Sequence, residues 1–305
     1  MRTLKENAIL LVFFLPILHL ISPSSQNQTI TDALGHTHIL GDAPQRIISL
    51  APNITEILFA LGLDEEIAGV TRYCNYPRKA RTKTRIGGLV DPDLEKIIHL
   101  QPDLVIAFRG NPLRMVHRLK DLGLPVFVLD EGMSLESVFA LIHKIGRVTG
   151  KEKAAEKLTT RLREKLQSIE DRLEKETKRP KVFIDLYGKG LWTFGEKSVL
   201  NDLVSKAKGE NVAGDIPRSW FNYNREELIH QDPEFIVVIS KSEQDFLDVK
   251  AWLAEEAHLE SIQAVQKGNI YFLEEDLIAR PGPRLFQALD RLARILHPSV
   301  FEEKP

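Results

Sequence analysis

The chain has 305 residues, a formal net charge of −2 and an isoelectric point near 6.5, and its length is enough for about two domains of the usual ~100–200 residues. The hydrophobic share of 43% is typical of a folded protein, and the balance of 41 Lys and Arg against 43 Asp and Glu excludes capture of nucleic acid by bulk charge. The single cysteine, Cys74, excludes an internal disulfide, a cysteine-ligated structural zinc and an iron–sulfur cluster.

Residues 1–25 predict a secretory signal peptide. Arg2 and Lys5 precede the apolar run Ala8–Ile21, and small and polar residues follow it. The run is shorter than the ~20 apolar residues of a membrane-spanning helix, although an uncleaved anchor is the alternative. No cysteine follows the run, so lipid anchoring is not expected. We therefore expect an exported protein that acts in the periplasm.

Strand and helix patterns alternate after the signal peptide. Thr29–Leu40 predicts a small edge hairpin, and Arg46–Leu50 predicts a strand before a helix that Asn53 or Thr55 caps and Gly62 ends. Continuous apolar strands alternating with helices predict an α/β lobe whose parallel sheet is covered on both faces. Its further strands are expected at Ile67–Val70, Leu104–Phe108 and Val126–Leu129, and its further helices at Asp93–Leu100 and Leu113–Leu122.

One long helix is predicted over Lys151–Lys178. Apolar residues recur there at i+3 and i+4 steps with charges between them, and Pro180 ends the segment. At 1.5 Å per residue the helix would be about 42 Å long. A coiled-coil dimer is the alternative, but the apolar stripe lasts only about three heptads. We expect a rigid connector, 149–179, between an N-terminal lobe, 29–148, and a C-terminal lobe, 180–298.

An internal repeat predicts that both lobes share one fold. Leu94–Ala107 aligns with Arg225–Val238 at a constant offset of 131 residues, and a weaker match pairs Gly123–Leu129 with Gly268–Leu273. Chance similarity between two helix–strand units is the alternative. Two lobes joined by one helix place the ligand site in the cleft between them. The first match has four identical pairs: Glu95 and Glu226, Ile98 and Ile229, His99 and His230, and Pro102 and Pro233.

The sequence contains no catalytic motif: a nucleophile elbow, a phosphate loop, a zinc-protease helix and a dinucleotide fingerprint are all missing. His36 and His38 are the only short metal-like spacing and have no third ligand nearby in sequence, so no metal site is expected. His99 and His230 lie where a cation interacts with terminal helix carbonyls. We expect a binding protein rather than an enzyme, with an exported metal-dependent hydrolase as the alternative class.

Aromatic residues are only 7% of the chain, yet several lie where strands run out into loops. Such loops line the ligand crevice of open α/β sheets. Each aromatic alone is also explained by packing, but their joint placement favours a large flat ligand held by stacking. Asp276 and Arg280 would add hydrogen bonds at the rim, with a structural i to i+4 salt bridge as the alternative. The aromatic candidates are Tyr73, Phe108, Trp192 and Trp220.

Most of the mature chain resembles the helical-backbone (class III) periplasmic binding proteins of ABC importers, and among them the cobalamin-binding family. The resemblance implies two similar α/β lobes with central parallel sheets joined by one long α-helix. It also implies a monomer without a resident cofactor, whose ligand is cobalamin or another corrinoid. The resemblance lies in the long helix and in RIISLAPNITEILFALG (Arg46–Gly62), TRYCNYP (Thr71–Pro77), DLEKIIHLQPDLVIAFRG (Asp93–Gly110) and NREELIHQDPEFIVV (Asn224–Val238).

The resemblance also implies which residues bind the ligand. The polar pair of the cobalamin pocket falls on Asp276 and Arg280. Where that family has a tryptophan before the first repeated helix, this chain reads Gly87-Gly88-Leu89, so one wall of the pocket would be aliphatic. The aromatic positions of the pocket fall on Tyr73, Phe108, Trp192 and Trp220.

The resemblance assigns one docking glutamate to each lobe. Glu95 and Glu226 would meet arginines of the two permease subunits of the importer, which works with its ATPase subunits. The alternative is helix chemistry, because a carboxylate in a first helical turn interacts favourably with the helix dipole. Receptors for ferric siderophores or haem share the same fold, and Arg72, Arg109 and Arg218 near the expected site keep such a ligand as the alternative.

Overall fold

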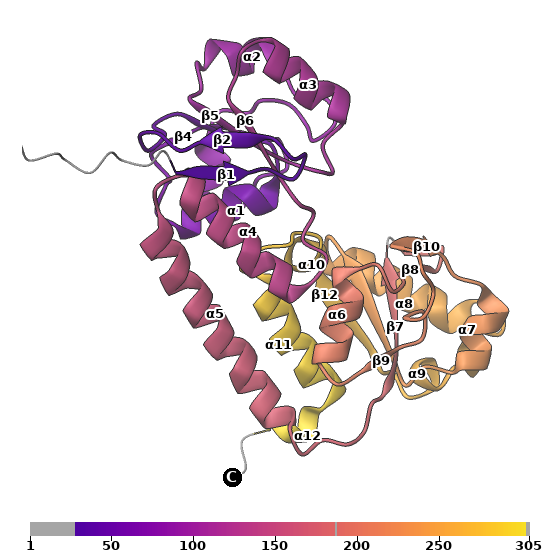
Figure 1. Cartoon of the computed structure of the whole chain (residues 1–305). Helices are drawn as coiled ribbons and strands as arrows, with labels where there is room; N and C mark the ends of the chain where they lie inside the picture. Colours follow the sequence, from indigo (N-terminus) through magenta and orange to yellow (C-terminus); the bar gives the residue numbers. More distant parts are fainter. Residues whose placement is uncertain (1–27, 187, 303–305) are drawn as a thin grey trace, which may run out of the picture.

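The computed structural model describes residues 28–186 and 188–302 as two α/β lobes joined along one long helix (Figure 1). The N-terminal lobe has the strands β1 (Thr29–Thr31), β2 (Thr37–Ile39), β3 (Ile47–Ser49), β4 (Ile67–Val70), β5 (Leu104–Phe108) and β6 (Val126–Leu129). Its helices are α1 (Pro52–Ala60), α2 (Leu94–His99), α3 (Leu113–Asp121), α4 (Leu135–Val148) and the 3-10 helix η1 (Arg78–Thr82).

A parallel sheet forms the centre of the N-terminal lobe. Its strand order is β4-β3-β5-β6, and every neighbouring pair is parallel. β1 and β2 form the predicted hairpin, which is antiparallel and makes a two-stranded sheet of its own instead of an edge of the central sheet. The predicted bounds of β4, β5 and β6 are confirmed, because each is a short apolar run whose residues are mostly buried on both faces of the sheet.

The predicted cap of α1 is wrong. The N-cap is Ala51, whose side chain makes no capping hydrogen bond, and Asn53 and Thr55 lie inside the helix. Pro52 at the first helical position explains the difference, since its fixed φ suits that position and it has no N–H to satisfy. Gly62 follows the helix with a φ of +75°, as its predicted role in ending the helix requires.

The long helix is shorter than predicted. It is α5 (Glu152–Leu173), 22 residues or about 33 Å, instead of the expected 28-residue segment. The five residues after Leu173, Glu174–Lys178, are all polar and offer no apolar side chain for packing, so the helix loses its tertiary support there. The apolar stripe of α5 packs within the chain, against α4 on one side. This use of the stripe contradicts the coiled-coil alternative.

The C-terminal lobe has the strands β7 (Lys181–Leu186), β8 (Trp192–Phe194), β9 (Glu210–Asn211), β10 (Trp220–Asn222), β11 (Phe235–Ser240) and β12 (Ile270–Glu274). Its helices are α6 (Val199–Lys206), α7 (Arg225–Gln231), α8 (Glu243–Glu255), α9 (Gln263–Gln266), α10 (Glu275–Ile278), α11 (Leu285–Leu296), α12 (Pro298–Phe301) and the 3-10 helix η2 (Leu259–Ser261).

The central sheets of the two lobes follow one path. In the C-terminal lobe β9-β7-β11-β12 are parallel neighbours, which matches the order β4-β3-β5-β6, and β8 and β10 extend the sheet antiparallel. The repeat found in the sequence corresponds to α2 leading into β5 and α7 leading into β11. Both units end at the cleft side of their sheet. The lobes are therefore two copies of one architecture.

The hydrophobic core runs without a break from one lobe to the other. Phe139 of α4 and Phe286 of α11 pack with ring centroids 5.1 Å apart, and both belong to one cluster that includes the buried face of α5. In Figure 1, α11 lies between α5 and the C-terminal sheet. The joint between the lobes is thus a packed core as well as a helix.

Within the described residues, no helix has the length and apolar character needed to span a membrane, and the expected signal peptide lies outside them.

Candidate functional site

A cavity of about 960 Å³ lies between the lobes. It is lined at or just beyond the carboxyl ends of parallel strands from both sheets, as at Ala51 after β3, Phe108 at the end of β5, Leu186 at the end of β7 and Lys241 after β11. Carboxyl ends of strands are where open α/β sheets bind ligands. The volume is at the upper end of the ~300–1,000 Å³ of ordinary ligand pockets, so the cleft suits a large ligand.

Aromatic side chains form walls of this cavity. Tyr73, Phe108 and Trp220 line it, and Tyr73 and Trp220 keep 49% and 60% of their surface exposed. Trp192 is not among the lining residues and packs beside Trp220, with ring centroids 5.2 Å apart and an angle of 40° between the rings. Phe194, which the sequence analysis missed, does line the cavity. Residues two apart on a strand share a face, so Trp192 on β8 could have indicated Phe194.

Asn111 organises the wall opposite. Its side-chain oxygen accepts a hydrogen bond from Phe108 N at 3.0 Å, and its Nδ2 donates to Leu89 O at 2.9 Å. Asn111 is 2% exposed, so these bonds are protected from water and hold two parts of the wall together. Leu89 lines the cavity, as the sequence Gly87-Gly88-Leu89 predicts for an aliphatic wall.

Asp276 and Arg280 also line the cavity, and they are already engaged with each other and with the N-terminal lobe. Arg280 is 8% exposed and pairs with Asp276 four residues earlier. It also donates to Glu56 at 3.1 Å, to Asn75 Oδ1 at 2.6 Å and to Tyr73 O at 3.2 Å. The salt bridge named as the structural alternative therefore exists. The pair faces the cavity and bridges the lobes at once.

The charges that line the cavity balance. Lys241 and Glu275 approach to 4.0 Å, and Asp276 pairs with Arg280. Balanced charge favours a ligand that is near neutral over a strongly anionic one. Among the described lining residues, four are cationic and four are anionic: Arg72, Lys197, Lys241 and Arg280, against Glu131, Glu274, Glu275 and Asp276.

Only one of the three arginines expected near the site lines the cavity. Arg72 does so, and it pairs with Asp91. Arg109 instead reaches Asp130 at 3.3 Å, and Arg218 lies over the ring of Phe221. Arg109 and Arg218 thus lie next to lining residues in the chain, as expected, but their own side chains do not line the cavity. Sequence proximity to a lining residue did not predict where these long side chains point.

Glu95 and Glu226 occupy equivalent exposed positions. Each is the second residue of its helix, after the N-caps Asp93 and Asn224, whose side chains accept from the backbone N–H three residues on. The caps satisfy the helix ends without help from the glutamates. Both carboxylates are thus presented to solvent, one from each lobe.

The two histidines of the β1–β2 hairpin contact the buried carboxylate of Asp32. His38 Nε2 lies 3.2 Å from Asp32, His36 Nδ1 lies 3.3 Å from it, and Lys120 Nζ is 3.0 Å from His36. Burial opposes ionisation of Asp32, but hydrogen bonds from His36 N, His38 and Leu34 N outweigh it and lower its pKa to about 2. The described part of the chain contains no group of three or more side chains able to hold a metal ion.

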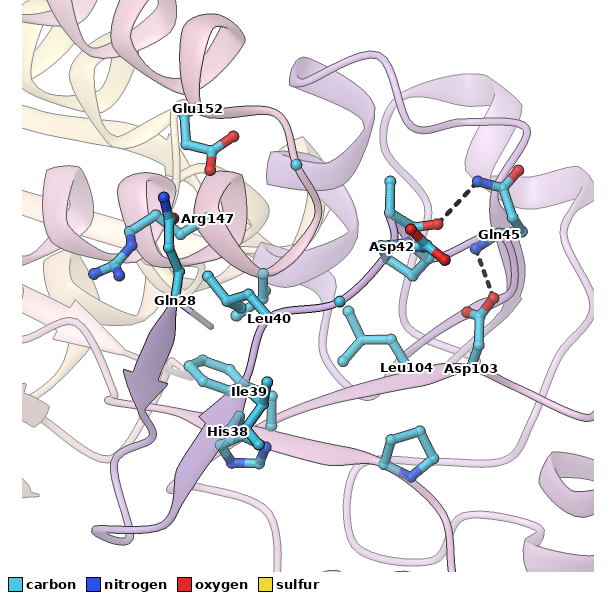
Figure 2. Close-up of a pocket in the computed structure, with 17 residues that line it drawn as sticks. Gln28, His38, Ile39, Leu40, Asp42, Gln45, Asp103, Leu104, Arg147 and Glu152 are labelled. Carbon is cyan, nitrogen blue, oxygen red and sulfur yellow. Dashed lines mark hydrogen bonds between the residues drawn. The ribbon is translucent and has the colours of Figure 1, made fainter. Parts of the chain in front are cut away.

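A second cavity, of about 660 Å³, lies in the N-terminal lobe between β2 and the joint of α4 and α5 (Figure 2). Its polar groups support the backbone around it. Asp103 accepts from Gln45 N at 2.7 Å and from Arg46 N at 2.9 Å, and Arg147 donates to Thr29 O at 3.1 Å. These bonds tie the start of β3 to the start of β5, and α4 to β1. We interpret the cavity as a structural seam rather than as a binding site.

Comparison with known proteins identifies relatives across nearly the whole chain. The family model for a periplasmic binding protein matches residues 47–277. An uncharacterized ABC transporter substrate-binding lipoprotein, YvrC of Bacillus subtilis, is 30% identical over 281 residues, which cover 90% of this chain and 87% of that protein. The vitamin B12-binding protein of Photorhabdus laumondii is 28% identical over 262 residues, covering 86% of this chain and 91% of the relative.

Solved structures share the same architecture. The periplasmic vitamin B12 binding protein BtuF of Vibrio cholerae superposes with a TM-score of 0.74 at 26% identity, over 86% of this chain and all of its own. The periplasmic heme-binding protein RhuT of Roseiflexus sp. RS-1 superposes with a TM-score of 0.76 at 24% identity, over 85% of this chain and all of its own. At that identity the second likeness shows the fold alone.

Proposed function

Because the chain belongs to the periplasmic binding protein family, we propose that its inter-lobe cleft captures cobalamin or a related corrinoid for delivery to an ABC importer. Proteins of this family bind and hand over ligands and are not enzymes. The relative in Bacillus subtilis is a substrate-binding protein of an ABC transporter, which supports an ABC importer as the partner of this chain. The choice of cobalamin as the ligand rests on the residues that line the cleft.

The observation that carries the proposal is the shape and chemistry of the cleft. Tyr73, Phe108 and Trp220 line a cavity of about 960 Å³, and aromatic faces suit the broad face of a macrocycle. The periphery of a corrinoid is rimmed by amides, which hydrogen bond to carboxylates, lysines and backbone groups. The balanced lining charge fits such a ligand better than it fits a strongly anionic siderophore. The vitamin B12-binding relatives support the same choice.

Haem is the second candidate, because Tyr73 and Met133 line the cavity and both side-chain types can bind haem iron. No histidine or cysteine lies among the described lining residues. Cobalamin needs no metal ligand from the receptor, since its cobalt is bound within the corrin and can keep its own axial ligands. A corrinoid can therefore bind in this cleft without a metal ligand from the protein, and this favours a corrinoid over haem.

Purified mature protein mixed separately with cyanocobalamin, haem and a ferric siderophore tests the ligand directly. We expect the colour of cobalamin alone to co-elute with the protein in gel filtration, with one molecule bound per chain. Co-elution of haem or the siderophore without cobalamin would overturn the corrinoid proposal.

Mass spectrometry of the exported protein tests the proposed removal of the signal peptide in the periplasm.

A further inference from the structure

Glu56 lies at the centre of a buried ion cluster that joins the lobes. It belongs to α1 of the N-terminal lobe, and its side chain is only 2% exposed. Arg284 donates to it twice, from Nε to Oε2 at 2.9 Å and from Nη2 to Oε1 at 2.6 Å, and Arg280 Nη1 donates to Oε1 at 3.1 Å. Both arginines belong to the C-terminal lobe. Three buried charges thus meet across the lobe boundary.

The cluster continues to the polar edge of the cleft. Arg280 pairs with Asp276, Asn75 Nδ2 donates to Asp276 Oδ2 at 2.6 Å, and Arg284 Nη2 donates to Asp276 O at 2.9 Å. The Arg284 guanidinium also stacks 4.1 Å from the centre of the Tyr76 ring. Asp276, Arg280 and Asn75 line the cavity, whereas Glu56 does not.

We propose that Glu56 is a positioning residue for the ligand cleft. By neutralising Arg280 and Arg284 from the opposite lobe, it holds the lobes at the spacing of the observed cleft. It also fixes Arg280 and Asp276 in the orientation that they present to the ligand, a step that rests on the proposed function. The angle between the lobes is therefore set by this cluster as well as by α5 and the packing of Phe139 on Phe286.

Buried charge explains why a single residue has this effect. Glu56→Gln removes the carboxylate that pairs with Arg284 and one of the two that pair with Arg280, and the side chains of these arginines are only 8% and 9% exposed. A buried ion that loses its partner is strongly unfavourable, so the arginines must regain water. The way to do so is to separate the two lobes at this point. Exposed ion pairs carry no such penalty, because solvent screens them.

Small-angle scattering without ligand tests the spacing. We expect folded Glu56→Gln to show a larger radius of gyration and a broader distance distribution than the unaltered protein. The matched control is Glu136→Gln, since Glu136 also holds an arginine, Arg163, through two bonds of 2.9 and 3.2 Å, but at the surface. The proposal would be overturned if the scattering profile of Glu56→Gln superimposed on the profiles of the unaltered protein and of Glu136→Gln.

A double-mutant cycle with cyanocobalamin as the probe tests the route to the ligand. We expect Glu56→Gln to weaken cobalamin binding at least about tenfold in the unaltered background, and much less in an Arg280→Gln background, because Glu56 acts through Arg280. Equal losses in both backgrounds would show a general structural effect and overturn the proposal. If the unaltered protein binds no cobalamin, the proposed function fails, and the ligand-free scattering still decides the role of Glu56.

Milder variants keep the test usable if Glu56→Gln does not fold. Glu56→Asp keeps the charge but shortens the reach, and Arg284→Lys keeps the charge but removes the bidentate fork. We expect both to fold and to shift the scattering in the same direction by a smaller amount. Unchanged scattering from both folded variants would overturn the role of the cluster in setting the spacing of the lobes.

Discussion

Trp192 packs against Trp220 across β8 and β10, with ring centroids 5.2 Å apart, and only Trp220 lines the inter-lobe cavity. The two tryptophans therefore have different relations to a ligand. Trp220 offers it a face, whereas Trp192 fixes the position of that face. This difference separates two substitutions that the sequence alone treats as equivalent.

Trp220→Ala should weaken cobalamin binding about ten- to hundred-fold, because a stacked aromatic face contributes roughly 1–3 kcal/mol. Trp192→Ala should cost less affinity and more stability, since it removes a packing partner of Trp220. Calorimetric titration and thermal unfolding of both variants measure the two effects. Equal affinity losses would place Trp192 in contact with the ligand. Unchanged affinity in folded Trp220→Ala would remove that residue from the site.

Gly110→Ala should weaken binding by displacing Phe108. A Cβ at position 110 would overlap the ring of Phe108, which must then turn from its observed place at the wall. We expect about a tenfold loss in cobalamin affinity with little loss of stability, since the ring can move toward the open cavity. Gly41→Ala is the control, because nothing lies within 4 Å of a Cβ there. Matching affinities for the two variants would contradict a contact at Phe108.

Local patterns predicted the elements better than their ends. The strand Leu104–Phe108 is confirmed residue for residue because its apolar run meets polar neighbours on both sides. The cap of α1 was mispredicted because Pro52 outweighs the preference of Asn53 for a cap. The end of α5 at Leu173 depends on where tertiary contacts stop, and a run without helix breakers does not reveal that point.

The site was predictable only in part, for a related reason. Tyr73, Phe108 and Trp220 lie near strand ends, a position that the sequence pattern reveals, and the structure gathers them at one cavity. The partners of Arg280 could not be found in the same way. Glu56 is 224 residues away along the chain, and no periodicity links the two. Contacts between lobes depend on how the lobes are packed, which the strand and helix patterns of each lobe do not determine.

Ligand binding should change the separation of the lobes very little. α5 resists bending because bending breaks i to i−4 hydrogen bonds, and the packing of Phe139 on Phe286 and the pairing of Glu56 with Arg284 oppose lobe motion as well. Scattering profiles with and without cobalamin should nearly superimpose. A large compaction on binding would contradict a rigid connection between the lobes.

Asp185 should make the protein less stable as pH rises. It is fully buried on β7, neither carboxyl oxygen has a hydrogen-bond partner within the described part of the chain, and burial raises its pKa well above 3.8. The folded state therefore holds a proton that the unfolded chain loses near its ordinary pKa, so this contribution falls as pH increases from that value toward the folded pKa.

Asp185→Asn removes that proton linkage, because an amide is neutral in both states. As the pH rises above about 4, we expect the free energy of unfolding of the unaltered protein to fall relative to that of the variant, because only the unaltered protein must keep a proton on Asp185 in the folded state. Urea denaturation at several pH values measures this difference in the free energy of unfolding. Asp215→Asn is the control variant, because Asp215 is exposed. A constant difference across the range would show that Asp185 is ionised in the folded protein.

Glu95 and Glu226 should be needed for transport but not for binding. They occupy the second position of equivalent helices, one in each lobe, and both face solvent. Two related lobes can present such a pair to a two-fold-symmetric permease, where cations would meet both carboxylates. The competing explanation is helix chemistry, because a carboxylate in the first turn interacts with the dipole for about 0.3–1 kcal/mol.

The double variant Glu95→Gln, Glu226→Gln separates these explanations in a reconstituted importer. It should bind cobalamin with unchanged affinity and unfold at nearly the same temperature, but fail to stimulate ATP hydrolysis or uptake. The matched control is Glu152→Gln, Glu243→Gln, since these exposed glutamates lie in the first turns of α5 and α8 and lose the same dipole interaction. If the control fails in transport equally, or the first variant transports fully, the two glutamates have only a structural role.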